Sequence, residues 1–146
     1  MTQLKNRLMQ YTALAAAIPA AGAQAGIVAQ TGLNVVLVPG QVEDDASIAW
    51  GAPGLQTNAA LLDAVRSACP DAYIVYKPHP DVLARKRRGE PQSSIGALAC
   101  NEIVTGVAIH RLFEQVDEVH VLTSLAGFEA LLRGKPVTCH GSPFFA

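Results

Sequence analysis

The 146-residue sequence alternates between two apolar periods from Asn34 onward, and this alternation constrains the fold more than any other feature. Short β-branched runs, which are typical of buried strands, occupy residues 34–38, 72–76 and 118–122. Segments with apolar side chains three and four positions apart, typical of amphipathic helices, occupy residues 58–69, 109–116 and 125–132. Strands of about five residues alternating with helices of about ten predict βαβ units, and therefore a parallel sheet with helices on both faces.

Turn and capping residues mark the ends of these elements. Thr57 is a suitable N-cap and Pro70 a suitable stop for the helix between them, while Gly134 ends the last helix. Weaker strands are predicted near residues 103–104 and 136–139. The basic stretch at residues 85–88 indicates a helix end with a solvated face.

The first part of the chain divides from the rest at about residue 33. Residues 4–17 predict an Ala-rich helix, and residues 19–32 a connection marked by Pro and Gly. The run ending at Ala25 imitates a signal peptide, but it is interrupted by Pro and Gly and is too short for a membrane span. We expect a cytoplasmic chain whose domain proper is residues 34–146.

Charge and missing motifs exclude several functions. The 11 basic and 12 acidic side chains nearly cancel, which argues against a nucleic-acid partner. A Gly-x-Gly-x-x-Gly fingerprint and a Walker loop are absent, which argues against a dinucleotide-dependent oxidoreductase and a P-loop enzyme.

A metal site is not expected either. The three cysteines lack metal-ligand spacing and are interpreted as small buried hydrophobes in a reducing compartment. His110 and His120 are predicted to be structural, because they lie far from each other and from other ligand types in the sequence.

Polar residues follow the predicted strands at their carboxyl ends, where parallel sheets bind ligands. The loops at residues 39–48, 77–81, 123–125 and 140–144 are therefore the candidates. In the first, Glu43, Asp44 and Asp45 follow Gln41. Either they form a solvated loop and helix start, or one of them faces the ligand as a nucleophile or base.

The loop that contains Lys77, His79 and Pro80 is more specific. Two prolines bracket the histidine and fix its backbone, so a rigidly held imidazole beside a lysine can bind a phosphate group. The alternative is a structural turn with a satisfied histidine.

In the loop after residue 122, Thr123 and Ser124 begin a helix with no acid in its first turn, which suits an anion. Glu129 is predicted at the margin of that helix's apolar face, where a carboxylate needs a partner. An ordinary capped surface helix is the alternative.

Three segments together resemble one family. They are residues 38–48 (VPGQVEDDASI), 71–82 (DAYIVYKPHPDV) and 117–134 (DEVHVLTSLAGFEALLRG). In this order they are similar to the capsule polysaccharide biosynthesis proteins that act as β-Kdo transferases. The resemblance covers about residues 34–146, although Cys100, Asn101 and His140 stand where the family leads us to expect an acidic pair and a tyrosine.

The resemblance implies a Rossmann-like, incomplete C-terminal lobe of a GT-B glycosyltransferase that binds CMP-Kdo and needs no metal or other cofactor. His79 and Pro80 then correspond to the motif that holds the CMP phosphate, Thr123 and Ser124 to the hydroxyl pair, and Glu129 to the acid at the ribose. Lys77 and Gln41 are added as donor-binding candidates.

For the reaction, the resemblance implies retention through a covalent glycosyl adduct. Asp45, or failing that Asp44, is the expected nucleophile within the acidic loop that begins at Glu43, and His79 helps to stabilise the leaving phosphate. With no acceptor-binding lobe in this sequence, the chain alone is expected to be weak or inactive.

The implied partners are a lipid-linked glycan acceptor and other capsule assembly proteins, with peripheral attachment to the inner membrane. A transferase that uses another CMP- or UDP-sugar, and a catalytically silent nucleotide-sugar-binding module, are the alternatives.

Overall fold

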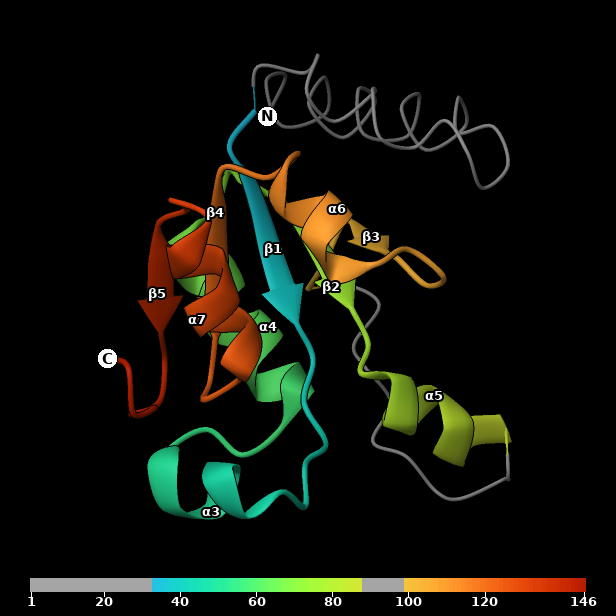
Figure 1. The fold of residues 1–146 in the computed structure, drawn as a ribbon, viewed down its shortest axis with the longest axis vertical. Coiled ribbons are helices and arrows are strands. Elements are labelled where there is room, and N and C mark those ends of the chain that lie inside the picture. Colours follow the sequence, from blue (N-terminus) through green and yellow to red (C-terminus); the bar gives the residue numbers. More distant parts are fainter. Residues whose placement is uncertain (1–32, 88–98) are drawn as a thin grey trace, which may run out of the picture. The chain divides into compact units, whose positions relative to one another are not determined.

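The computed structural model describes residues 33–87 and 99–146, which belong to the unit Leu33–Ala146. Its centre is a five-stranded parallel sheet of order β3-β2-β1-β4-β5 (Figure 1). The strands are β1 (Val35–Pro39), β2 (Tyr73–Lys77), β3 (Glu102–Ile103), β4 (Glu118–Val121) and β5 (Val137–Cys139). The predicted α/β class and the parallel sheet are confirmed.

β1 and β2 are buried along most of their length, because helices cover both faces of the sheet. All five residues of β1 are buried, and only the last residue of β2 is partly exposed. The register pairs Val36 with Ile74 and with Glu118, so alternate residues of the three central strands face the same side.

One face of the sheet is covered by α4 (Asn58–Ala68), with α3 (Ala46–Gly51) beside it. Leu61, Leu62 and Val65 of α4 join Val36 and Ile74 in one buried cluster. Thr57 caps α4, as predicted, by accepting a hydrogen bond from the Ala60 amide at 3.0 Å. The predicted capping and apolar spacing of this helix are therefore confirmed.

The opposite face carries α6 (Ile109–Phe113) and α7 (Leu125–Leu132), as Figure 1 shows. Gly127 of α7 packs so closely on the sheet that a Cβ there would lie 2.9 Å from a methyl carbon of Val121. Gly134 follows α7 with a φ of 74°, so the predicted helix stop is confirmed. The helix predicted over 109–116 is shorter, because α6 ends at Phe113.

The remaining described helix, α5 (Pro80–Arg87), begins directly after the loop that follows β2. Pro80 is its first residue, the position where a missing amide hydrogen costs nothing. None of the helices within the described residues is long and apolar enough to span a membrane. The helix and connection predicted over residues 4–32, and the loop around 89–94, lie outside the described residues.

Candidate functional site

The carboxyl ends of the strands form the edge at which ligands bind in parallel α/β sheets, above all where the chain reverses its winding. From β1 the chain moves outward to β2 and β3 and then returns to β4 on the other side of β1. The reversal therefore lies between β1 and β4. The loops after β1, β2 and β4 meet at this edge, as the sequence predicts.

Gln41 is the centre of the loop after β1. It is 7% exposed, and its main chain pairs twice with the side chain of Asn58, which is 3% exposed. The Gln41 amide donates to Asn58 Oδ1 at 2.9 Å, and Asn58 Nδ2 donates to the Gln41 carbonyl at 2.8 Å. Because both polar groups of this peptide are satisfied, the loop can lie buried at low cost.

The Gln41 side chain also joins the two strands on either side of the reversal. Its Nε2 donates to Thr123 Oγ1 at 3.0 Å, and its Oε1 accepts from the Thr123 amide at 3.0 Å. Thr123 Oγ1 then donates to Ser47 Oγ at 3.2 Å. Gln41 and Thr123, both predicted to bind the donor, thus fix the loops that would surround it.

Two of the three consecutive carboxylates act as helix caps. Glu43 Oε1 accepts from the amide of Asn58, the first residue of α4, at 2.8 Å. Asp45 is the N-cap of α3, and its Oδ1 accepts from the Ser47 amide at 2.8 Å. Asp44 lies exposed between them. The helix-start interpretation of this loop is therefore confirmed for Asp45, whereas Glu43 contacts the start of a later helix, α4.

Asp45 is held in its ionised form. The hydrogen bonds from Ser47 lower the pKa of its carboxyl below the usual value, and the nearby charge of His79 adds a smaller effect in the same direction. Asp45 and His79 come from the loops after β1 and β2. These two loops follow neighbouring strands of the sheet.

His79 presents one ring nitrogen to its own helix. Its Nδ1 accepts from the Asp81 amide at 3.1 Å, and this tautomer carries its hydrogen on Nε2. The side chain is 40% exposed, so Nε2–H can donate to a bound anion. Pro80 fixes the start of α5 behind the ring.

Lys77, two positions before His79 in the sequence, carries a positive charge. Burial lowers the pKa of its ammonium group. Among the described residues that ammonium has no hydrogen bond or ion pair, although the Lys77 carbonyl accepts from the Gly40 amide at 2.8 Å. An anionic ligand at this edge would restore the solvation that the ammonium has lost.

The helix that begins after β4 has a side-chain cap, which agrees with the alternative of an ordinary capped helix. Ser124 is the N-cap of α7 and accepts from the Ala126 amide at 3.2 Å, and the first turn holds no acidic residue. Glu129 is exposed, so the burial argument for a bound partner does not apply to it. Its predicted role at the ribose stays a prediction.

One buried polar group at this edge has no partner. Within the described residues the Tyr76 hydroxyl accepts and donates no hydrogen bond, although the side chain is fully buried. It lies against Gly40, where a Cβ would come within 2.6 Å of the oxygen. Glycine at residue 40 therefore allows the loop after β1 to cross directly over the tyrosine.

Sequence reasoning missed the residues that hold this edge together. The helical spacing of residues 58–69 does not show that Asn58 pairs with the loop after β1, and no sequence pattern assigns Ser47 its contact with Thr123. One sequence signal could have indicated the role of Asn58. It is a polar residue on the apolar side of a helix, directly after the N-cap, and a polar side chain buried there needs a hydrogen-bond partner.

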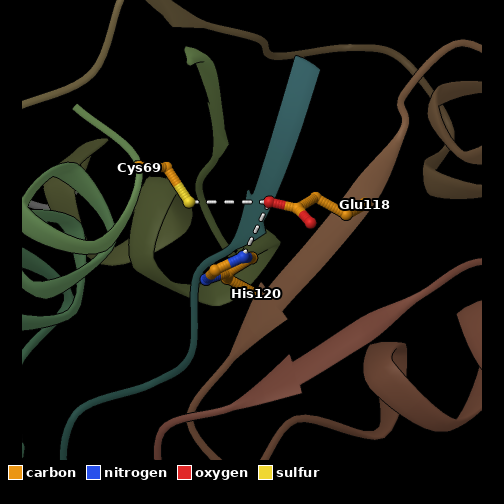
Figure 2. Close-up of side chains that lie close together, drawn as sticks. All are labelled: Cys69, Glu118 and His120. Atoms are coloured by element: carbon orange, nitrogen blue, oxygen red, sulfur yellow. Dashed lines mark hydrogen bonds and ion pairs between the residues drawn. The ribbon is translucent and has the colours of Figure 1, made fainter. Parts of the chain in front are cut away.

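A second polar cluster lies away from this edge. Cys69 Sγ is 3.5 Å from Glu118 Oε1, which is 3.1 Å from His120 Nε2 (Figure 2). The prediction that His120 lies far from other ligand types is wrong, because alternate residues of a strand share a face and Glu118 lies two positions away. His110 stays exposed on α6, outside this cluster.

The chain matches the family model described as capsule polysaccharide biosynthesis protein over residues 3–146. The capsule polysaccharide modification protein LipA of Neisseria meningitidis serogroup A / serotype 4A is 49% identical over 116 residues, which are 80% of this chain and 16% of LipA. The lipopolysaccharide-processing protein LpsZ of Rhizobium meliloti is 41% identical over 111 residues, covering 76% of this chain and 25% of LpsZ.

Among solved structures, the beta Kdo 2,7 transferase of Thermosulfurimonas dismutans KpsC superposes with a TM-score of 0.68 at 42% identity. The superposition covers 98% of this chain and 42% of that one. The beta Kdo 2,4 transferase of the same protein has a TM-score of 0.61 at 23% identity and shares the fold. The chain thus spans less than half of each of these relatives.

Proposed function

The chain belongs to the capsule polysaccharide biosynthesis protein family, and on this premise we propose that it supplies the donor-binding lobe of a retaining β-Kdo transferase. The donor is CMP-Kdo, and the acceptor is a lipid-linked glycan in the linker of a capsular polysaccharide. The relatives are named for capsule modification and for Kdo transfer. One observation carries the proposal: Lys77 and His79 lie at the carboxyl end of β2 and α7 begins at the carboxyl end of β4, and these two strands flank β1 at the same edge of the sheet.

The leaving phosphate of CMP is bound by this set of groups. His79 Nε2–H donates to a phosphate oxygen, the Lys77 ammonium neutralises charge, and the positive end of α7 faces the anion. Because the Gln41–Thr123 pair fixes the start of α7 against the loop after β1, the positive end of this helix is already oriented before the donor binds. Charge that develops as CMP departs is stabilised without a metal ion.

Asp45 is the proposed nucleophile. Its lowered pKa keeps the carboxylate ionised, and its Oδ1 is held by the Ser47 amide, which leaves Oδ2 to attack the anomeric carbon. The bond to the CMP phosphate breaks as the Kdo–carboxylate bond forms. A general base then takes the proton of an acceptor hydroxyl as its oxygen displaces the carboxylate, so two inversions retain the configuration.

Calorimetric titration of the 146-residue chain with CMP tests donor binding, with UMP as the control ligand. We expect CMP to bind in preference to UMP, and His79→Ala to weaken CMP binding at least about tenfold, because a charge-assisted hydrogen bond is lost. His110→Ala is the matched control, since His110 is an exposed histidine on α6. Equal affinity of His79→Ala and the parent for CMP would contradict the proposed site, and preference for UMP would indicate a different donor.

Transfer itself is tested in a complete transferase that also contains an acceptor-binding lobe. Asp45→Asn is expected to abolish transfer and keep CMP binding, because the amide oxygen can still cap α3 but cannot act as a nucleophile. Asp44→Asn is the control in the neighbouring residue. Full activity of the Asp45→Asn enzyme would support a catalytically silent nucleotide-sugar-binding module or a nucleophile elsewhere.

The cellular setting follows from the acceptor. Because a lipid-linked acceptor lies in a membrane, we propose peripheral attachment at the cytoplasmic face of the inner membrane, together with contacts to other capsule assembly proteins. Cell fractionation of the complete transferase, with and without its lipid acceptor, checks this part of the proposal.

A further inference from the structure

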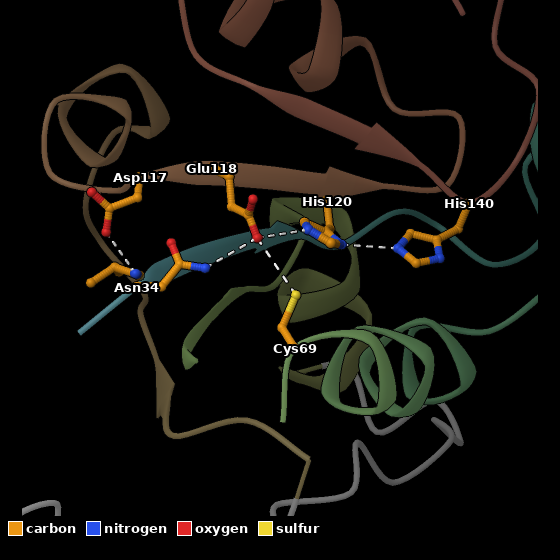
Figure 3. A network of polar contacts seen from close by, with 7 residues as sticks. Asn34, Cys69, Asp117, Glu118, His120 and His140 are labelled. Carbon is orange, nitrogen blue, oxygen red and sulfur yellow. Dashed lines mark hydrogen bonds and ion pairs between the residues drawn. The ribbon is translucent and has the colours of Figure 1, made fainter. Parts of the chain in front are cut away.

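A cluster of metal-ligating side chains lies on the face of the sheet that α4 covers, at the side of β4 and β5 (Figure 3). Cys69 is the C-cap of α4. Glu118 and His120 are alternate residues of β4 and so point to the same face. Cys69 and Glu118, which are 49 positions apart in the sequence, thus lie together, and with His120 they offer three different types of metal ligand.

The three donor atoms are spaced as the ligands of one small cation. Two nitrogen or oxygen ligands at ~2.0 Å from a tetrahedral zinc ion lie about 3.3 Å apart, and a sulfur at ~2.3 Å lies about 3.5 Å from either of them. Here Glu118 Oε1 is 3.1 Å from His120 Nε2 and 3.5 Å from Cys69 Sγ, and all three atoms lie within 4.8 Å of one another. Two of the three separations already match tetrahedral coordination.

We propose that Cys69, Glu118 and His120 form a zinc-binding site. A set made of one sulfur, one carboxylate oxygen and one imidazole nitrogen suits zinc, which accepts all three, and does not suit magnesium or calcium, which prefer oxygen. On binding, the Cys69 thiol gives its proton to solvent and the thiolate forms the bond to zinc. Water takes the fourth position, since Glu118 is 26% exposed.

A second histidine orients the first. His120 Nδ1 lies 3.0 Å from His140 Nε2, on the side of the ring away from Glu118. With His120 Nε2 on the metal, Nδ1 carries the hydrogen and His140 accepts it, which is the usual support for a metal-bound histidine. His120 is only 3% exposed, so packing holds its ring in this orientation.

The crowding at Glu118 supports the same inference. Its Oε1 lies within hydrogen-bonding range of Cys69, His120 and the side-chain Nδ2 of Asn34, the last at 3.4 Å. One oxygen thus faces three groups. A zinc ion bound to this oxygen would coordinate two of them directly and bring the end of α4 onto β4.

The site is tested with the metal alone, on the 146-residue chain. Zn²⁺ titration by calorimetry is expected to give one ion per chain. Co²⁺ titration is expected to give the thiolate-to-cobalt charge-transfer absorption and the visible bands of a tetrahedral ion. Cys69→Ser is expected to remove the charge-transfer absorption, and Glu118→Gln to weaken Zn²⁺ at least about tenfold.

Matched controls use the same residue types outside the cluster. Cys139→Ser and His110→Gln are expected to bind Zn²⁺ as the parent does, and circular dichroism checks that every variant is folded. The proposal is overturned if Zn²⁺ does not bind stoichiometrically to the folded chain. It is also overturned if Cys69→Ser binds Zn²⁺ and Co²⁺ as the parent does, or if Cys139→Ser loses as much affinity for Zn²⁺ as Cys69→Ser. In each of these cases Cys69, Glu118 and His120 would form only a hydrogen-bonded chain.

Discussion

The carboxyl edge of the sheet and the Cys69–Glu118–His120 cluster are both polar regions on the same parallel sheet, but they are held in different ways. At the carboxyl edge, Gln41 pairs reciprocally with Asn58 and Thr123, so the framework is satisfied by itself. In the cluster, several groups face one carboxylate oxygen. The first arrangement leaves His79 and Lys77 to meet a ligand, whereas the second draws its own side chains together.

This difference separates residues that stabilise the loops of a site from residues that bind its ligand. The Gln41 framework fixes loops, and removing it should damage folding and binding together. His79 lies outside that framework, and removing it should damage binding alone. The predictions below test this separation, beginning with the largest expected effect.

Asn58→Ala is expected to lower the free energy of unfolding by about 2–4 kcal/mol, because it leaves both polar groups of the buried Gln41 peptide without partners. Urea denaturation of the variant measures this. Asp63→Ala, on the exposed side of the same helix, should change stability by less than about 0.5 kcal/mol. Equal effects of the two substitutions would show that the Gln41–Asn58 pair does not hold the edge.

Gly40→Ala is expected to cost about 1–3 kcal/mol, because the new Cβ would overlap the Tyr76 hydroxyl. Tyr76→Phe removes that oxygen, which is buried without a partner among the described residues, and should leave stability equal to the parent's or higher. The double variant should therefore lose less than Gly40→Ala alone. Strict additivity in a double-mutant cycle would contradict the close contact.

Asp45→Ala is expected to cost about 0.5–1 kcal/mol through loss of the cap on α3, while Asp45→Asn should cost less. The lowered pKa of Asp45 also makes a contribution to stability that is present above the unfolded value of 3.8 and lost as pH falls through the folded value. Urea midpoints at about pH 6 and about pH 3 measure this dependence. The Asp45→Asn variant should show a smaller fall, since the amide does not titrate.

The smallest expected effect tests whether the two regions are independent. Cys69→Ser should leave CMP affinity unchanged, and His79→Ala should leave Zn²⁺ affinity unchanged, because separate sites of this kind are normally additive. Calorimetry with each ligand on both variants gives the four values. A change of more than about threefold in either cross-measurement would mean that the two regions are coupled through the sheet.

Much of the fold could be predicted because its signals are local. Thr57 before α4 and Gly134 after α7 lie where capping chemistry requires them, and the β-branched runs became the three central strands. The carboxyl-edge loops could be predicted too, because parallel strands bring their ends to one side. The end of α6 could not, since the apolar spacing continues through Val116 after the helix has ended.

The site residues and their functional roles stay predictions, but the structure shows what several of these side chains contact. Glu43 and Asp45 are candidates because they follow a predicted strand at its carboxyl end, and the structure shows that each accepts a hydrogen bond near the start of a helix. Glu129 is predicted to need a partner because it lies at the margin of an apolar helix face. In the structure it is exposed, and this exposure depends on how α7 packs against the sheet. Asn58 was missed because its partner is a main-chain group 17 residues away.

The sequence by itself determined the parallel sheet, the loops that meet at its carboxyl edge and the family, because each depends on patterns within a few residues or on motifs kept in order. Only the tertiary structure decided that Gln41 ties β1 to β4, and that Cys69 lies against Glu118 and His120. Those contacts join residues 82 and 49 positions apart. Packing of α4 against the sheet sets such distances, and no local pattern contains them.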